Sequence, residues 1–541
     1  MAARPLVKPP FWPLAMLALV LALQATLVIG RAVNWDEFYH YSQVHKLAAG
    51  TLVQPLQTLY TRAFLWVTAL PGSGIDHIVT IRWFMLGCEI ATILAIAGIA
   101  GRFASRQAAW LCALAYAGAG YVFQHATSFR FDAPAAALLM GAAWIALRSR
   151  LGPGAIIASG LLIGTAAMLT IKAVLYAPVF AGIAWLRWQE SGRAPATLAR
   201  LAGIALASAV AFAAIYWLHA ASLAGNVDDE AKAILGRAGG KMFSLGIQPY
   251  WPHHLKGAAI APVVTAMLLA FPFVLRRAER PLAEKLALIG LVAPLATLLF
   301  YHNTAPYYFV FMLAPVCAGL APVMDRALQR YSEALIAMVL AALAGAVWMM
   351  EQPGPQDRQR QLLAQAERLF PDHPAYFDSC AMLGNFPKAN AFMTPMGIAL
   401  YRQGSYPAMA DTLERRAVPL VLAADPLFER VMGGNQPVPE LLEQDLAALR
   451  GNYVRYWGPF WVAGREIASA GDFTLLVPGS YRIEGAELLI DGKLHPAGSV
   501  IELDRGPHRA EPRGGKARLI WAKARPAPAE PAPTGPWFTD F

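Results

Sequence analysis

The chain has 541 residues, of which 57% are hydrophobic and only 15% are charged, whereas about 25% of an average soluble domain is charged. This composition excludes an intrinsically disordered chain and an ordinary soluble enzyme. The net charge of +10 is uneven, because residues 1–350 hold 25 basic and 13 acidic residues while residues 351–541 hold 20 and 22. The positive charges lie between apolar runs, which is typical of membrane topology and not of a nucleic-acid-binding face.

Apolar runs of about 17–25 residues are candidate membrane spans, since roughly 20 residues cross the hydrocarbon core. Residues 1–350 contain eleven such runs, which predicts a polytopic α-helical membrane protein with about eleven spans. They are residues 11–30, 78–100, 107–124, 131–147, 155–171, 173–188, 198–222, 257–275, 283–300, 307–323 and 333–350.

The loops between these runs predict their orientation. If the N-terminus is cytoplasmic, alternate short loops carry 15 of the 25 basic residues, as the positive-inside rule requires. Two long loops, 31–77 and 223–256, and the C-terminal region then lie outside. The Ala/Arg/Pro-rich composition and the lack of an Asn-x-Ser/Thr sequon with x other than Pro predict a bacterial inner membrane with the C-terminus in the periplasm.

Residues 351–541 are expected to form extracytoplasmic modules. A helix at 357–370, strands at 375–378 and 418–425 and a helix at 440–450 predict an α/β domain over 351–471. Short alternating strands with IDG and DRG turns then predict a small β-sandwich over 472–525. The Pro/Ala-rich tail, 526–541, is expected to be extended and loose.

No metal site is predicted. The four cysteines lie far apart, at residues 88, 112, 317 and 380, without metal-binding or redox spacing. His253 and His254 are adjacent but lack carboxylates at matching spacing. A divalent cation is left open as a cofactor, and no other cofactor is predicted.

The strongest local signal is the segment NWDEFYHYSQVHKLAAG (34–50), directly after the first span. Residues 37–49 have helical spacing, with Tyr41 on one face, and predict an amphipathic helix along the membrane surface. Removing the charged side chains of Asp36 and Glu37 from water at such a boundary costs free energy. They are either functional carboxylates or the acids that cap this helix.

Two further charged groups begin or end spans. Asp132 opens the fourth span two residues after Arg130 and is either functional or simply that arginine's partner. Lys172 interrupts apolar sequence between the fifth and sixth spans, so its amine needs an anionic partner or must reach the interface. A lipid phosphate is one such partner.

The stretch FYHNTAPYYFVFMLAP (300–315) adds a polar patch at the outer boundary. Tyr307 and Tyr308 are substrate-binding candidates or members of an aromatic belt. His302 and Asn303 are less easily explained by such a belt. Weaker candidates on the outer side are Arg62 and Arg82.

Taken in order, these residues resemble the GT-C glycosyltransferases, in particular the family 39-like branch of protein O-mannosyltransferases and lipid A aminoarabinose transferases. The resemblance covers about the first 320 residues, and its motifs are individually weak. It rests on Asp36 and Glu37 after span one, Tyr39 or Tyr41, Gly50, Pro55, Arg82 at span two, Asp132 at span four, Thr170 and Lys172 after span five, and Tyr307, Tyr308, Leu313 and Pro315 in a late span. The late motif lacks the family's usual basic residue, for which His302 is a substitute. The β part at 472–525 resembles a PEGA-type module more loosely.

The resemblance implies a polyprenyl-phosphate sugar as donor and a lipid, glycan or protein hydroxyl as acceptor, with inversion at the anomeric carbon. It implies Asp36 as general base, with Glu37 and Asp132 orienting the acceptor or holding a metal. Lys172, Arg82, His302 and Arg62 would bind the donor phosphate. Tyr41, Arg130, Asn303, Tyr307 and Tyr308 would contact substrate.

Two alternatives belong to other classes. A secondary transporter would explain many spans and the intramembrane Lys172, but transporters show inverted repeats and midplane polar groups, and no repeat stands out. A non-catalytic envelope-assembly protein would use the C-terminal modules but would leave Lys172 unexplained.

Overall fold

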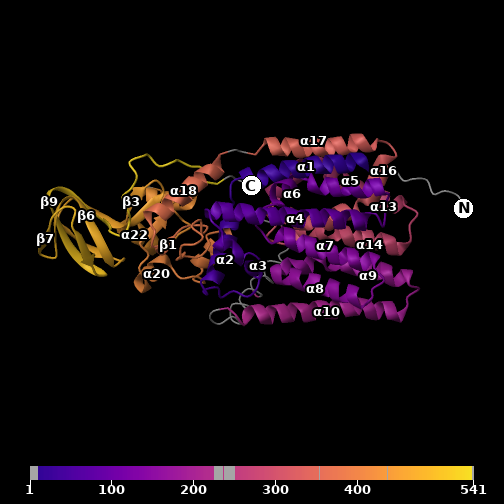
Figure 1. Cartoon of the computed structure of the whole chain (residues 1–541), viewed down its shortest axis with the longest axis horizontal. Coiled ribbons are helices and arrows are strands. Elements are labelled where there is room, and N and C mark those ends of the chain that lie inside the picture. The colour runs from indigo at the N-terminus through magenta and orange to yellow at the C-terminus, as the bar shows by residue number, and fades with distance from the viewer. Residues whose placement is uncertain are drawn as a thin grey trace.

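The computed structural model describes residues 10–223, 236, 246, 250–351, 354–434 and 436–538. The molecule is elongated (Figure 1). A bundle of long helices forms one half, and a smaller part that contains the β-strands forms the other.

Every one of the eleven predicted apolar runs is helical, some of them in two pieces. The helices of the bundle are α1 Phe11–Gly30, α4 Gly74–Ala100, α5 Arg106–Ala117, α6 Gly120–His125, α7 Asp132–Arg148, α8 Pro153–Leu169, η2 Ile171–Tyr176, α9 Ala177–Glu190, α10 Pro195–Ala220, α12 Trp251–Ala259, α13 Pro262–Arg277, α14 Leu282–Val292, η3 Ala293–Leu299, α15 Tyr308–Gly319, α16 Ala321–Leu328 and α17 Glu333–Met349.

By length and composition, four helical segments in the described ranges can cross a membrane: α1, α4, α10 and Leu282–Leu299. The bent pairs α12/α13 (98°) and α15/α16 (57°) raise this number to six. Others, such as α8 and α17, are apolar but have only 17 residues. The structure therefore supports a multi-pass membrane protein, and the number of eleven spans stays a prediction.

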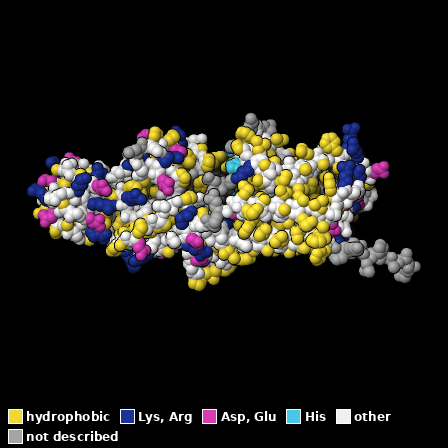
Figure 2. All heavy atoms as spheres, turned by 90° about the horizontal axis from the view of Figure 1, so that it is seen from above, with side chains coloured by type: hydrophobic (Ala, Val, Ile, Leu, Met, Phe, Trp, Pro, Cys, Tyr) yellow, Lys and Arg dark blue, Asp and Glu magenta, His cyan; other side chains and the backbone are white. Residues whose placement is uncertain are grey.

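The surface of the bundle is that of a lipid-facing protein. Hydrophobic side chains dominate it, whereas charged side chains are spread over the strand-containing half (Figure 2). The bundle residues Leu206, Trp217 and Leu269 are each more than 60% exposed, a degree of exposure that would be costly in water.

Loops predicted to share a membrane face also contact one another. Arg102 pairs with both Glu190 and Glu284, and Ser105 donates to Asp325. These contacts join loops that alternate along the chain. Which face is cytoplasmic stays a prediction.

Outside the bundle, three short helices follow α1: α2 Trp35–Ala48, α3 Tyr60–Ala63 and η1 Leu65–Ala69, with an irregular stretch between α2 and α3. The helix predicted at 37–49 is thus confirmed. It does not lie open along the membrane surface, because its Phe38, Tyr41 and Val44 are buried in the same core as residues of the C-terminal half.

The C-terminal half combines five helices with one nine-stranded sheet. The helices are α18 Pro355–Leu369, α19 Pro395–Arg402, α20 Met409–Arg415, α21 Pro426–Gly433 and α22 Glu443–Asn452. The strands are β1 Tyr376–Phe377, β2 Leu420–Leu422, β3 Tyr453–Trp457, β4 Phe460–Ile467, β5 Gly471–Leu475, β6 Gly479–Ile490, β7 Lys493–His495, β8 Val500–Leu503 and β9 Gly506–Trp521.

The sheet crosses the boundary predicted at residue 471. Strand β4 pairs with β2 and β3 of the α/β part and, further along, with β9 of the β part. The main strand order is β1-β2-β4-β9-β6-β7, and β1 pairs with β2 in parallel. The predicted strands at 375–378 and 418–425 are present but short, with two and three residues.

The described part of the tail, residues 526–538, packs against the C-terminal half. Trp537 is buried, and its carbonyl accepts a hydrogen bond of 2.8 Å from the Gln359 side chain of α18. Proline residues leave an extended chain little conformational entropy to lose. The two aromatic residues that follow Pro536 supply the apolar surface for docking.

The two halves meet around α2. Tyr39 of α2 stacks on Phe392 of the C-terminal half with ring centroids 4.5 Å apart. Tyr41 packs so closely on Gly384 that a Cβ there would overlap its ring. The segment 378–393 therefore packs against α2 at two points.

Candidate functional site

The site is built from the first turn of α2. Asn34 is the N-cap: its side chain accepts a hydrogen bond from the backbone N–H of Asp36 (2.9 Å), and Glu37 accepts one from the backbone N–H of Asn34 (2.9 Å). This capping box follows from the local sequence Asn-Trp-Asp-Glu. Successive helical residues point about 100° apart, so the two neighbouring carboxylates face different surroundings.

Glu37 is held entirely within the protein. It accepts hydrogen bonds from Arg82 Nε (2.8 Å) and Nη2 (2.6 Å) and from the backbone N–H of Phe129 (2.7 Å), in addition to the cap. Burial favours a raised pKa for Glu37, but the Arg82 ion pair and the backbone donors hold it below its ordinary value. A carboxylate so stabilised is a poor proton acceptor.

Arg82 likewise makes its hydrogen bonds within the protein. Its remaining N–H groups donate to the backbone carbonyls of Val28, Arg31 and Ala32. All five donors of the guanidinium are thus used internally. Arg82 supports the end of α1 and the start of α2 and has no N–H group left for a donor phosphate.

Asp36 belongs to a second charged cluster. Its carboxylate pairs with Arg130, which lies in the loop before α7 and also donates from Nε to Asp132 (3.3 Å). Asp132 pairs in turn with Lys172, which lies in η2. Four alternating charges from three chain segments thus form a continuous row, Asp36–Arg130–Asp132–Lys172.

Aromatic rings enclose the two cations. The guanidinium of Arg130 lies 3.3 Å from the ring centroid of Tyr307. The amine of Lys172 is 5.1 Å from the Phe131 ring, 5.6 Å from Tyr308 and 5.9 Å from Phe311. Such rings stabilise cations that are removed from water.

Asp36 is the accessible end of the row. Its side chain is 17% exposed, compared with 2% for Asp132 and 1% for Glu37. Within the described ranges, only one of its two carboxylate oxygens takes part in a hydrogen bond. A reacting hydroxyl can therefore approach Asp36 but not Glu37.

The polar patch at 300–308 lies partly at this site. Tyr307 donates from its hydroxyl to Asn303 (3.1 Å) while its ring faces Arg130. Tyr308 is buried and hydrogen-bonds to Thr297 (2.7 Å). His302 is half-buried, and no hydrogen bond of its side chain is found within the described ranges.

The structure does not bring Tyr41 and Arg62 into the row. The Tyr41 hydroxyl bonds to His77 (2.6 Å), and its ring packs at the junction of the two halves. Arg62 donates to His219 (2.8 Å) of α10 and to Ser222.

The sequence analysis missed His40. It lies one helical turn after Asp36, is buried, and hydrogen-bonds to the Tyr60 hydroxyl (2.8 Å). Burial, together with the positive charges of Arg130 and Lys172, lowers the pKa of His40 well below the ordinary value and so favours the neutral ring. The i, i+4 spacing from Asp36 was the signal that could have found it.

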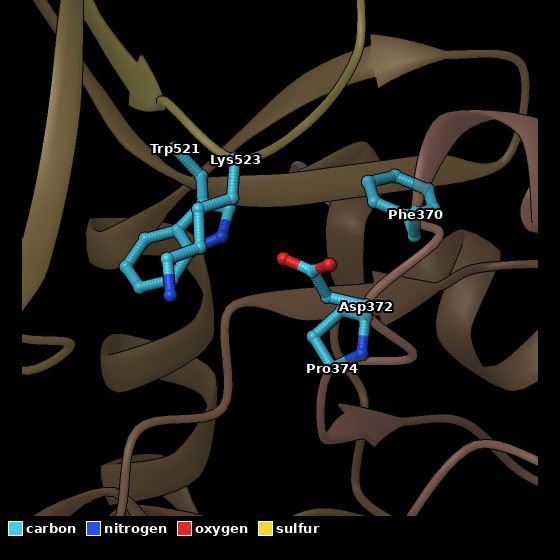
Figure 3. A pocket seen from close by; sticks show the side chains of 5 residues that line it. All are labelled: Phe370, Asp372, Pro374, Trp521 and Lys523. Carbon is cyan, nitrogen blue, oxygen red and sulfur yellow. The ribbon is translucent and has the colours of Figure 1, made fainter.

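The described residues include no group of three or more His, Cys, Asp or Glu that could hold a metal ion. His254 hydrogen-bonds to Thr304 (2.7 Å) instead. A cavity of about 170 Å³ lies elsewhere, between the end of α18 and the end of β9. There the Asp372 carboxylate points into the space beside Trp521 and Lys523 (Figure 3). No predicted site residue lines it.

Comparison with known proteins gives matches in structure. No family model matches the chain, and no curated protein sequence matches it. The fold is similar to that of ArnT from Cupriavidus metallidurans, solved with bound undecaprenyl phosphate: the identity is 14%, the TM-score is 0.56, and 80% of this chain and 96% of that chain are covered.

The fold is also similar to the oligosaccharyltransferase of Archaeoglobus fulgidus, in the apo form and tethered to an acceptor peptide. Both matches are 13% identical and cover 92% of this chain and 76% of that one, with TM-scores of 0.52 and 0.51. These proteins have the GT-C fold, so the fold predicted from the sequence motifs is confirmed.

Proposed function

We propose that the chain is a membrane glycosyltransferase that moves a sugar from a polyprenyl-phosphate donor to an acceptor hydroxyl. The observation that carries the proposal is the row that joins an accessible carboxylate, Asp36, to the buried cations Arg130 and Lys172. A sugar phosphodiester needs these two elements, a base for the acceptor and cations for the leaving group. The GT-C fold and the bound undecaprenyl phosphate of ArnT support this class of donor.

In this proposal, Arg130 and Lys172 bind the donor phosphate. Negative charge grows on the phosphate as it leaves, and preorganised cations stabilise that charge in a site shielded from water. Both cations are now neutralised by Asp132 and Asp36. A bound phosphodiester would compete with those carboxylates and would release Asp36 from Arg130.

The released Asp36 would act as general base. The acceptor oxygen forms a bond to the anomeric carbon, the bond from that carbon to the phosphate oxygen breaks, and its electron pair leaves with polyprenyl phosphate. The hydroxyl proton goes to Asp36. A single displacement inverts the anomeric centre. A divalent cation stays open as a further source of positive charge.

The position of the row favours a transferase over a transporter. Asp36, Arg130 and Asp132 lie at the starts of α2 and α7, and Lys172 follows the end of α8. These helix ends lie on the side of the bundle where Tyr39 of α2 stacks on Phe392 of the C-terminal half. We place this side in the bacterial periplasm, where a lipid, glycan or protein acceptor can approach.

The proposal is tested by sugar transfer from radiolabelled polyprenyl-phosphate sugars in membranes that contain the wild type or Asp36→Asn. We expect a product with the wild type and about a hundredfold loss with the variant, the size of a missing general base. Asp372→Asn, in the remote cavity, is the matched control and should keep full activity.

If Asp36→Asn still forms product, the chain is a transferase, but a group other than Asp36 accepts the proton of the acceptor hydroxyl. If no donor yields product and the purified wild type also fails to bind undecaprenyl phosphate, the glycosyltransferase proposal is rejected.

A further inference from the structure

We propose that the C-terminal strap, residues 525–538, and Gln359 of α18 together position the carboxylate of Asp36. The proposal rests on the function proposed above. It assigns no reacting group to the strap, whose role is to hold the first turn of α2.

The strap runs from the end of β9 back along α18. After β9, the backbone N–H of Arg525 donates to the carbonyl of Leu369 (3.0 Å), and the Trp457 indole donates to the carbonyl of Glu530 (3.1 Å). Near its end, Arg358 donates to the carbonyl of Pro536 (3.2 Å). These three contacts lead from the last residue of α18, past β3, to the first turn of α18, where the strap reaches α2.

Gln359 connects the strap to α2. Its amide nitrogen donates to the carbonyls of Trp537 and Val33, and its amide oxygen accepts from the backbone N–H of Val33, each at 2.8 Å. The side chain is fully buried. Val33 thus has both of its backbone groups fixed directly before the N-cap, Asn34.

Phe538 holds the same turn from another direction. Its ring stacks on Trp35 at 6.1 Å and meets Phe38 edge-on, also at 6.1 Å. Trp35 and Phe38 flank Asp36 and Glu37 in the sequence. The strap therefore contacts α2 on both sides of the acidic pair.

This placement matters because Asp36 and Arg130 lie on different elements. Glu37 is already anchored by Arg82 and by the Phe129 amide, so α2 stays docked without the strap. The direction of Asp36 depends in addition on the cap at Asn34, which follows the residue that Gln359 fixes. A misplacement of about 1 Å can cost about a hundredfold in rate.

The test compares Gln359→Met and Phe538→Ala with the wild type by two measurements on the full chain. The first is hydrogen exchange of the amides of residues 33–38, which needs no substrate. The second is the steady-state kinetics of sugar transfer from the donor that supports wild-type activity. Gln361→Met, at an exposed glutamine of the same helix as Gln359, is the matched control.

We expect faster exchange at 33–38 in both variants, and a kcat about tenfold lower with the donor KM within twofold. Phe538→Tyr should restore the wild-type values because it keeps the ring. Gln361→Met should match the wild type in both measurements.

Unchanged exchange at 33–38 overturns the inference whether or not transfer is found. A kcat that is unchanged, or that falls only in proportion to a loss of folded protein, overturns it too. If the variants exchange faster but the wild type transfers no sugar from any donor, the proposed function fails, and with it the catalytic part of this inference.

Discussion

Glu37 and Arg82 form a buried ion pair in which every hydrogen-bonding group is used. Removing one partner leaves the other charge buried and alone, which typically costs about 3–5 kcal/mol. We expect Glu37→Gln to lower the melting temperature of the detergent-purified protein sharply, with activity lost as folded protein is lost.

The double variant Glu37→Gln/Arg82→Met should recover part of that loss, because no uncompensated charge remains. The control is Glu190→Gln, which breaks ion pairs with Arg102 and Arg187 that are 24–30% exposed and should cost less than about 1 kcal/mol. A melting temperature for Glu37→Gln equal to that of Glu190→Gln would contradict the structural role.

Lys172 is expected to act on the donor. Hydrogen bonds to charged groups contribute roughly 1.5–3 kcal/mol, so Lys172→Met should weaken binding of undecaprenyl phosphate by about tenfold or more. Lys172→Arg should retain most of the affinity. Lys285→Met, in the first turn of α14, controls for a general loss of positive charge.

Binding can be followed by titration of the purified protein with undecaprenyl phosphate at two salt concentrations. If Lys172→Met and the wild type bind undecaprenyl phosphate with equal affinity, Lys172 does not bind the donor phosphate.

Residue types and their order were sufficient to select the members of the charged row. The sequence could not assign the different roles of Asp36 and Glu37. Their separation arises from the helical rotation between neighbours and from Arg82 and Arg130, which lie about 45 and 94 positions away. Likewise, Arg62 and Arg82 have the right charge for a phosphate, but long-range partners occupy them.

At the scale of elements, apolar length predicted the helices well, because a helix satisfies its own backbone in lipid. Strands β1 and β2 were located, but their two- and three-residue lengths depend on pairing partners distant in the sequence. The docked strap was missed because a Pro/Ala-rich segment has no periodicity, and its contacts with Gln359 and α2 come from Trp537 and Phe538.

Helix α21 carries a pH-dependent cap. Asp425 caps it through the backbone N–H groups of Leu427 and Phe428. Burial, reinforced by the charge of Asp378, raises the pKa of Asp425 to about 7. Because the pKa of Asp425 is higher in the folded state than in the unfolded state, its protonation stabilises the fold. This stabilisation is complete below the unfolded pKa of about 4 and is lost as the pH rises to about 7.

We therefore expect the α/β part to be less stable at pH 8 than at pH 5. Asp425→Asn, which is neutral and still a good cap, should remove most of that difference. Hydrogen exchange of residues 420–433 at matched intrinsic rates measures it, with Asp472→Asn as an exposed control. Identical pH dependence in Asp425→Asn and the wild type would exclude Asp425 as the cause.

At the scale of the whole molecule, the C-terminal half packs against α2, the helix that carries Asp36. Tyr41 links α2 to both halves, through a hydrogen bond to His77 of α4 and through packing against Gly384. The resemblance to GT-C enzymes rested on the first 320 residues and could not predict this junction, because it lies between segments more than 300 positions apart.

Gly384→Ala tests whether the junction matters. The added Cβ would overlap the Tyr41 ring. The ring is buried and its hydroxyl is hydrogen-bonded to His77, so moving it breaks native contacts. We expect this overpacking to lower the free energy of unfolding by about 1–3 kcal/mol. The two halves should separate more readily, which limited proteolysis after Glu351 would detect as faster cleavage, and sugar transfer should fall. Gly433→Ala, where a Cβ meets no atom within 4 Å, should cleave at the wild-type rate. If both alanine variants are cleaved alike and transfer sugar equally well, the contact of Tyr41 with Gly384 is not what holds the C-terminal half against α2. The stack of Tyr39 on Phe392 and the strap must then hold the C-terminal half in place.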